Sequence, residues 1–591
     1  MNRKIFVLFL MFCMIVFTSC NTTQSSQNTE YADTVVYGTI WTAEADDVVE
    51  AFAIKGDKFI YVGDKSGVKP YIKECVTNVI DNTEKGLVIP ACTEGHGHFI
   101  GIDSLVRMFP GYYAEYEELV KILTDEMKKD PKPEFFLSWG WDYLKFVNSY
   151  DPNRNYAEEL EQIAPGIPVF MFDTGGHNAI CNVTALKKAG VYNGEKVRGG
   201  AVTTTDAGIP NGLIGDEVVF YVIDKIIDFS KIDSEVYYTA CKNAVDTLHK
   251  RGFTNYLDAY INALSEKPFY QYINELDKKG ELNINIDTCI TIRSFEDYEY
   301  KERIDYAVEM ADKYHTEHFD PYNIKLFADG VVESFTGWLI DEYPYPEKGK
   351  EHGNIVWKQE ELNEIVKYAN SKDILVHTHA FGDGAVKAMI DTYINSNNEL
   401  GKMYPNTLGH VRNITQEDIK RASENNIGIA ENLIWHAALI DYDENYEETI
   451  NAISKMFPDN IFEFGYPMKS LIDAGITVSS STDAPCAESI EGNIFNIIEI
   501  ATTGQIIDDS NPVPYNPSEL LTVREALECL TINGALNMGI EDKTGSIKVG
   551  KNADFVIVDT NFLDYKGDDL RNIHNSKIKN VYFEGKEVYK G

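Results

Sequence analysis

The feature that most constrains the fold is a long alternation of apolar, strand-like segments with helix-like segments through the middle of the chain. Eight segments have strand character, at residues 87–93, 253–259, 284–292, 323–328, 374–379, 407–410, 427–432 and 476–481. Helix-type segments between them include residues 360–371, 385–395 and 416–425. Alternation of this kind predicts a parallel sheet, and eight steps predict an α/β fold of the (β/α)8 barrel type.

Both ends of the chain are instead rich in β-type segments. Gly56 and Asp57 form a turn signal inside one of them, which predicts a hairpin. The pattern predicts one small sheet domain built from residues 34–90 together with residues 540–591, and a barrel domain over residues 91–539. About 150 residues separate the first two barrel strands, too many for a loop. Residues 101–249, approximately, are therefore expected to form an inserted subdomain over the barrel mouth.

The N-terminus has the parts of a targeting segment. Arg3 and Lys4 precede an apolar run over residues 5–17, and small residues then lead to Cys20. This order is typical of a signal peptide, and the ending resembles a bacterial lipobox, whose cysteine is lipidated after cleavage. We expect a signal peptide over 1–20, a polar tether over 21–33, and a lipid-anchored protein of the cell envelope. No later segment has 18 consecutive apolar residues, so anchoring is favoured over spanning.

Composition excludes one class of partner. The 591-residue chain is 44% hydrophobic, as in ordinary globular proteins, and carries a formal net charge of -39. Such a charge repels phosphates and argues against a nucleic-acid partner. A small-molecule substrate is expected, and the sequence leaves oligomer formation open.

Candidate metal ligands occur at the carboxyl ends of the predicted strands, where barrel enzymes place their active sites. His96 and His98 follow the first strand with i, i+2 spacing, which puts both imidazoles on one side of an extended chain. Other strand ends carry further candidates: Lys325, His377, His379, His410 and Asp483. Histidines and carboxylates that converge in this way indicate a divalent-metal site.

These motifs resemble the amidohydrolase superfamily, in particular its amidohydrolase-3 branch of YtcJ-like proteins. The resemblance also rests on segments outside the predicted ligands: Trp139-Gly-Trp-Asp142, Pro168-Val-Phe-Met-Phe-Asp-Thr-Gly-Gly-His177, Gly208-Ile-Pro-Asn-Gly-Leu213, Thr531-Ile-Asn-Gly-Ala535 and Gly545-Ser-Ile-Lys-Val-Gly-Lys-Asn-Ala-Asp554. It implies a distorted TIM barrel with a composite β-sandwich from both termini.

The resemblance implies a role for each strand-end residue. His96 and His98 are expected to bind the more buried metal, with Asp483 as a further ligand and the catalytic base. Lys325 is expected to be carbamylated and to bridge two metals, because an ammonium group cannot ligate a cation but a carbamate can. His379 and His410 are expected to bind the second metal. The metals are predicted to be zinc, with iron or manganese as alternatives.

Four residues near these motifs are not part of the expected ligand set. The family's His-Ala-x-Gly-Asp motif selects His379 over His377, although both share one face of the strand. Glu94 stands where the family usually has aspartate, two residues before the first histidine. His177 and Glu333 are weaker candidates for substrate contact.

The predicted chemistry is metal-assisted hydrolysis of a non-peptide C–N bond in an amide or cyclic amide. One alternative is deamination by the same kind of site, against which Lys325 argues. A metallopeptidase would need basic groups for the peptide termini, and none is identified. The alternative from another class is a non-catalytic lipoprotein that binds a ligand. No predicted metal ligand is missing, which favours the enzyme.

Overall fold

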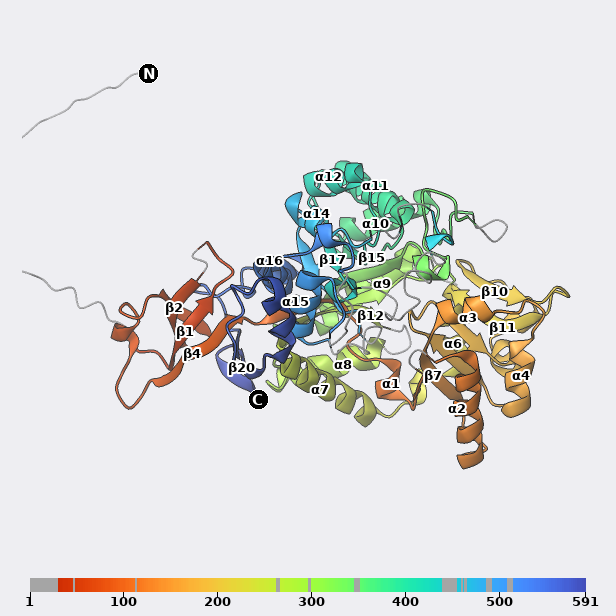
Figure 1. The fold of residues 1–591 in the computed structure, drawn as a ribbon, viewed down its shortest axis with the longest axis horizontal. Coiled ribbons are helices and arrows are strands. Elements are labelled where there is room, and N and C mark those ends of the chain that lie inside the picture. The colour runs from red at the N-terminus through yellow and green to blue at the C-terminus, as the bar shows by residue number, and fades with distance from the viewer. Residues whose placement is uncertain are drawn as a thin grey trace, which may run out of the picture.

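The computed structural model describes residues 30–591 except for 46–47, 112–113, 262–265, 296–298, 345–350, 438–453, 459–460, 462–464, 485–491 and 508–513. The predictions for the signal peptide, most of the tether and Cys20 therefore lie outside the described residues. Three sheets organise the described chain, and Figure 1 shows them along the long axis of the molecule. The barrel lies between the sheet formed by the termini and the sheet of the inserted region.

The central sheet has eight parallel strands in the order β18-β17-β16-β15-β14-β13-β12-β5. Its two outer strands, β18 and β5, lie against each other, so the sheet forms a nearly closed barrel, as predicted. The strands are β5 (Cys92–Gly97), β12 (Phe253–Ile261), β13 (Asn285–Thr291), β14 (Phe319–Phe327), β15 (Leu375–His379), β16 (Thr407–Gly409), β17 (Gly428–Glu431) and β18 (Val478–Ser480).

The first predicted strand, over residues 87–93, is wrong as a single strand. Residues 87–90 end β4 (Asn78–Pro90) and pair with β19 in the terminal sheet, whereas the first barrel strand, β5, begins at Cys92. The ladder changes at Ala91, whose N–H donates to the carbonyl of Asp554, while the N–H of Cys92 donates to Gly252. A continuous apolar run thus serves two sheets, because both are buried at this junction and need the same residue types.

The terminal sheet has seven strands in the order β21-β20-β19-β4-β1-β2-β3, which joins the two ends of the chain. The predicted hairpin at Gly56 is confirmed, since β2 and β3 pair antiparallel on either side of it. The remaining strands of this sheet are β1 (Thr34–Trp41), β2 (Val48–Lys55), β3 (Lys58–Gly63), β19 (Phe555–Val558), β20 (Ile578–Phe583) and β21 (Lys586–Lys590).

The region between β5 and β12 contains a sheet of its own, in the order β10-β11-β9-β8-β7-β6. Its strands are β6 (Phe109–Pro110), β7 (Phe136–Trp141), β8 (Val169–Asp173), β9 (Asn178–Cys181), β10 (Gly200–Thr204) and β11 (Pro210–Asp216). Its helices are α1 (Ile102–Leu105), α2 (Tyr116–Lys129), α3 (Tyr143–Ser149), α4 (Tyr156–Ile163), α5 (Val183–Lys188) and α6 (Glu217–Ile226). The next helix, α7 (Ser234–Arg251), packs on α8 and β12 of the barrel.

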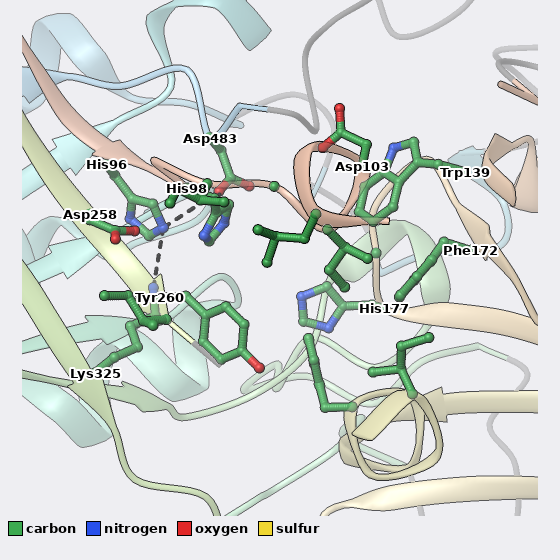
Figure 2. A pocket seen from close by; sticks show the side chains of 18 of the residues that line it. His96, His98, Asp103, Trp139, Phe172, His177, Asp258, Tyr260, Lys325 and Asp483 are labelled. Carbon is green, nitrogen blue, oxygen red and sulfur yellow. Dashed lines mark hydrogen bonds and ion pairs between the residues drawn. The ribbon is translucent and has the colours of Figure 1, made fainter. Parts of the chain in front are cut away.

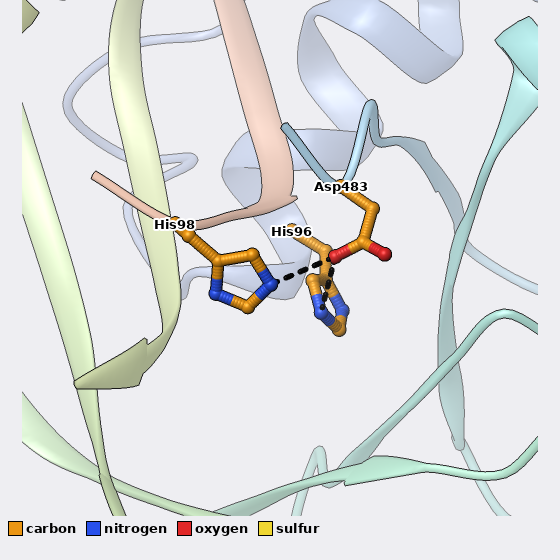
Figure 3. Close-up of side chains that lie close together, drawn as sticks. All are labelled: His96, His98 and Asp483. Carbon is orange, nitrogen blue, oxygen red and sulfur yellow. Dashed lines mark hydrogen bonds and ion pairs between the residues drawn. The ribbon is translucent and has the colours of Figure 1, made fainter. Parts of the chain in front are cut away.

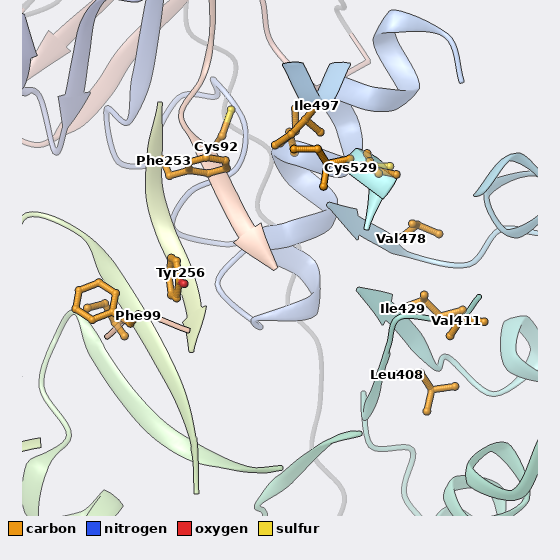
Figure 4. Close-up of a cluster of buried hydrophobic side chains, with 14 of the residues drawn as sticks. Cys92, Phe99, Phe253, Tyr256, Leu408, Val411, Ile429, Val478, Ile497 and Cys529 are labelled. Atoms are coloured by element: carbon orange, nitrogen blue, oxygen red, sulfur yellow. The ribbon is translucent and has the colours of Figure 1, made fainter. Parts of the chain in front are cut away.

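Helices surround the barrel, and the main hydrophobic core lies between them and the strands. Figure 4 shows part of this core, where Cys92 and Phe253 lie on one side and Val478, Ile497 and Cys529 on the other. The remaining helices are α8 (Glu266–Lys278), α9 (Tyr300–Tyr314), α10 (Gln359–Ser371), α11 (Asp383–Leu400), α12 (Gln416–Glu424), α14 (Met468–Asp473), α15 (Ile494–Thr503), α16 (Val523–Leu530) and α17 (Ile532–Asn537). Within the described ranges, no helix combines the length and apolar character needed to cross a bilayer.

Candidate metal centre

A pocket of about 140 Å³ lies at the carboxyl ends of the barrel strands, beneath the inserted region. Six of the predicted metal-site residues line it together: His96, His98, Lys325, His379, His410 and Asp483. They lie near or just beyond the carboxyl ends of β5, β14, β15, β16 and β18, so parallel strands bring residues almost 400 positions apart to one place. Figure 2 shows His96, His98 and Asp483 at one end of the pocket and the side chains of Trp139 and Phe172 at the other.

His96, His98 and Asp483 form a cluster whose donor atoms all lie within 4.8 Å of one another (Figure 3). The Oδ1 atom of Asp483 lies 2.9 Å from His98 Nε2 and 3.5 Å from His96 Nε2. Ligands about 2.1 Å from a tetrahedral metal lie about 3.4 Å from one another, close to the separations in this cluster. The donor set, two imidazoles and a carboxylate, therefore fits a divalent metal such as zinc.

Backbone contacts hold these three residues together. The N–H of Asp483 donates to the carbonyl of His96, and the N–H of His98 donates to the carbonyl of Ala484. Asp483 has φ of 52°, a left-handed conformation that costs energy for a residue with a Cβ. Burial alone raises the pKa of Asp483, but His410 and His98 lower it to about 2, so the group is ionised at neutral pH.

Glu94, the residue in the unusual position, joins the first and last barrel strands. Its buried carboxylate accepts hydrogen bonds from the N–H and the hydroxyl of Thr482, both at 2.8 Å, and from the N–H of His96 at 3.2 Å. Burial raises the pKa of Glu94 to about 7 despite these donors. The side chain thus connects β5 to the segment that carries Asp483. An aspartate here is one methylene shorter, so its backbone would have to lie closer to Thr482 to accept the same hydrogen bonds.

Lys325 lies beside the cluster at the end of β14. Its Nζ is 3.2 Å from His96 Nε2, and the side chain is buried. Burial lowers the pKa of Lys325 to about 7. A large fraction of this amine is then neutral at physiological pH, and only a neutral amine can react with carbon dioxide to give a carbamate.

The two histidines of β15 have different surroundings. His377 has Nε2 2.7 Å from Nδ1 of His96 and Nδ1 2.6 Å from the Thr407 hydroxyl, so both of its ring nitrogens are engaged away from the pocket. His379 lines the pocket, with Nε2 2.9 Å from the carbonyl oxygen of Gly330. A metal-binding histidine is commonly oriented by a hydrogen bond to the ring nitrogen that does not bind the metal. Of these two histidines, His379 is among the residues that line the pocket, whereas His377 contacts His96 from outside it.

His410 completes the predicted group. It adopts φ of 63°, and its Nδ1 is 2.5 Å from the side-chain oxygen of Asn432. Its ring centre lies 5.0 Å from that of His379 and 4.2 Å from that of His96. Burial lowers the pKa of His410 to about 4 and that of His379 well below its usual range. Both imidazoles are therefore neutral at physiological pH, the form that binds metals.

The two weaker candidates have different locations. His177 lines the pocket from the inserted region, with its ring centre 5.0 Å from that of His379 and its Nδ1 3.1 Å from Asp216. Glu333 is not among the described residues that line the pocket, and its carboxylate accepts a hydrogen bond from Arg412 Nε at 2.8 Å.

Asp258 is a pocket residue that the sequence reasoning missed. It lies in β12, where it accepts a hydrogen bond from the N–H of Phe99 at 3.3 Å, and burial raises its pKa to about 7. The signal was present, because the predicted strand over residues 253–259 has Asp258 at its carboxyl end. The strand-end rule that selected Asp483 would have selected Asp258 as well.

The fold and the pocket define a barrel enzyme with a site for divalent metal. The model of the amidohydrolase family matches residues 80–589, most of the chain. The protein therefore belongs to the amidohydrolase family and is a hydrolase that acts on carbon–nitrogen bonds other than peptide bonds.

Known relatives align along most of their length. A putative amidohydrolase, YtcJ of Bacillus subtilis, is 22% identical over 85% of this chain and 89% of its own. An N-substituted formamide deformylase of Arthrobacter pascens is 21% identical over 93% of this chain and 97% of its own. The crystal structure of an uncharacterized metal-dependent hydrolase from Pyrococcus horikoshii superposes with a TM-score of 0.65 at 20% identity, over 90% of this chain and 98% of that one. At this level of identity the structural likeness shows the fold alone.

Proposed function

We propose that this protein hydrolyses a non-peptide amide or cyclic amide bond at a site for two divalent metals. The observation that carries the proposal is the convergence of His96, His98 and Asp483, with donor atoms within 4.8 Å of one another at the end of an apolar pocket. A relative named for deformylation of N-substituted formamides supports the choice of an amide.

Six residues would hold the metals. His96, His98 and Asp483 would bind the first, and His379 and His410 the second, with carbamylated Lys325 between them; zinc is the expected metal. Bound metal would lower the pKa of water and polarise the scissile carbonyl. The low pKa of Lys325 favours the carbamate, because the neutral amine is the reactive form.

Asp483 would move the proton. Its pKa of about 2 keeps it ionised, its Oδ1 lies 2.9 Å from His98 Nε2 and 3.5 Å from His96 Nε2, and the residue lines the pocket. It would accept a proton from the attacking water and deliver it to the leaving nitrogen, which departs poorly as an anion. His177 faces the same cavity from the inserted region and would contact the substrate there.

The test is a hydrolysis screen with metal-reconstituted protein lacking residues 1–20. The panel contains N-formyl amines, N-acyl amines, lactams, hydantoins and N-acyl amino acids, with amidines and amino-substituted rings for the deamination alternative. The new carboxylate of each amide product is measured by mass spectrometry, and released ammonia is measured separately. We expect hydrolysis of at least one amide class, lost on metal removal and restored by metal. Ammonia released only from amidine or ring substrates would instead assign the protein to deamination. Binding without turnover of any substrate would favour a ligand-binding lipoprotein.

We also propose that the protein is anchored to the cell envelope through Cys20. The support is the order of parts in the sequence, with Arg3 and Lys4, an apolar run over 5–17 and small residues before Cys20. Incorporation of labelled fatty acid into the full chain tests this directly. The Cys20→Ala variant should lose the label, and a label that persists in this variant would contradict the proposal.

A further inference from the structure

We propose that the group recognised beside the metal centre is neutral and apolar, about the size of one six-membered ring, and that it occupies the space between the barrel mouth and the inserted region. The inference rests on the proposed hydrolytic function and names the class of substrate. It excludes substrates that carry a free carboxylate on this group, including N-acyl amino acids with their side chain and carboxylate in this space.

Most of the side chains that line this space away from the metal end are apolar, and they come from several elements. Ile102 and Leu105 come from α1, Phe172 from β8 and Ile223 from α6. The barrel supplies Phe327, at the end of β14. Figure 2 shows further lining side chains between the metal-site residues and Trp139. Such walls favour an apolar ligand group, because its burial contributes about 25 cal/mol of binding free energy per Å² of apolar surface removed from water.

The size of the pocket sets the size of the group. Its volume is about 140 Å³, and an apolar protein cavity of about 150 Å³ accommodates benzene. This volume includes the metal end of the pocket, which His96, His98 and Asp483 also line. One aromatic ring, or a branched or cyclic alkyl group of about six carbons, is therefore the upper limit for the apolar group.

The charges of the pocket select against an anionic group. Among the described lining residues, the acidic side chains are Asp103, Asp258 and Asp483, and the one lysine or arginine is Lys325, which lies at the metal end beside His96. Asp103 is at the opposite end in Figure 2. His177 also lines this region; burial lowers its pKa, but the hydrogen bond to Asp216 and the nearby carboxylates together outweigh burial and raise it. The positive charge of His177 is therefore already paired with Asp216, 3.1 Å away. A substrate carboxylate in the apolar region would lose its hydration and gain no unpaired cationic partner from these residues.

An ion pair behind the wall fixes three of the aromatic rings. The guanidinium of Arg293 lies 3.8 Å from the ring centre of Phe220, 4.8 Å from that of Tyr260 and 4.3 Å from that of Phe327. It also donates to Glu217 at 2.9 Å, and both charged groups are buried. The three rings line the pocket and Arg293 lies behind them. The barrel and the inserted region are thus joined by a contact that holds the rings in place before substrate arrives.

The test compares two isoleucines of α6. Ile223 and Ile226 are both 1% exposed in the same hydrophobic cluster, but only Ile223 is among the described pocket residues. Ile223→Ala and Ile226→Ala should therefore cost similar stability and differ in their effect on substrate. The substrates are N-alkyl formamides and alkyl carboxamides with one to eight carbons, each also made with a terminal carboxylate.

With wild type, we expect kcat/KM to rise about threefold to fourfold per methylene in one of the two series, up to about six carbons, from the transfer free energy of a methylene. A terminal carboxylate should lower kcat/KM at least tenfold. Ile223→Ala should lower the ratio of kcat/KM for the six-carbon substrate to that for the one-carbon substrate about tenfold or more. Ile226→Ala should keep the wild-type profile. A flat series, or a preference for the carboxylate, with hydrolysis retained overturns the inference.

A binding measurement separates this inference from the hydrolytic function. Benzyl alcohol should raise the melting temperature of wild type and Ile226→Ala and raise that of Ile223→Ala less. Terephthalate, which must place a carboxylate in the apolar region whichever end faces the metals, should have no effect at the same concentration. If no substrate is hydrolysed, this result still supports the apolar pocket. Equal stabilisation by terephthalate, or none by benzyl alcohol, contradicts it whatever the hydrolysis screen shows.

Discussion

The protonation state of Lys325 can be tested through the stability of the metal-free protein. Burial lowers the pKa of this lysine to about 7 in the folded protein, against about 10.4 in an unfolded chain. Between these values the unfolded state holds one proton more than the folded state. The free energy of unfolding must then rise with pH. The buried lysine lowers it by the full amount below about pH 7 and not at all above about pH 10.4.

The expected size follows from the width of that window. A difference of about 3 pKa units corresponds to about 4–5 kcal/mol in total, and each pH unit inside the window to about 1.4 kcal/mol. From about pH 7.5 to about pH 9.5, metal-free wild type should therefore gain about 2–3 kcal/mol relative to Lys325→Met, whose side chain does not titrate.

The assay is urea unfolding of both proteins, free of metal and carbon dioxide, at several pH values across this window. Other groups that titrate, such as unfolded cysteines, are common to both proteins and cancel in the difference. Parallel stability curves for wild type and Lys325→Met would refute the reasoning, since they would mean that the folded protein keeps Lys325 charged and unavailable for carbamate formation.

Three further changes test the metal centre. Asp483→Asn should retain at least one metal per chain and lose nearly all hydrolysis, measured by elemental analysis and amine release, and full activity would exclude Asp483 as the base. Lys325→Ala should lower the metal content to one or none per chain, because the bridging group is removed, and two metals still bound would exclude the bridge. His377→Phe should weaken metal binding about 10–100-fold at unchanged stoichiometry, because His96 loses its orienting contact at 2.7 Å. A competition titration measures this, and loss of one metal per chain would instead identify His377 as a ligand.

The barrel was predictable because its strands are buried on both faces, which makes each one a short apolar run that stands out in the sequence. The same property caused the error at residues 87–93, where Pro90 ends a strand of the terminal sheet and Cys92 begins a barrel strand. Apolar composition reports burial but not which sheet a residue joins. That choice is made by hydrogen bonds to Asp554 and Gly252, which are far apart in the sequence.

The site was predictable for a related reason, since strand ends of a barrel all face one place. This rule finds Lys325 and Asp483 because each lies near or just after the end of a strand. It does not separate His377 from His379, because these differ only in the contacts of their ring nitrogens, to His96 for His377 and to Gly330 for His379. The substrate pocket is harder to predict from the sequence, because its walls combine Leu105 and Ile223 of the inserted region with Phe327 of the barrel. In the sequence each of these is an ordinary core residue, and only packing of the inserted region on the barrel turns them into one surface. Selectivity in this enzyme should therefore change through the inserted region while the metal ligands stay constant, which makes Ile223 a better position than any ligand at which to alter the substrate.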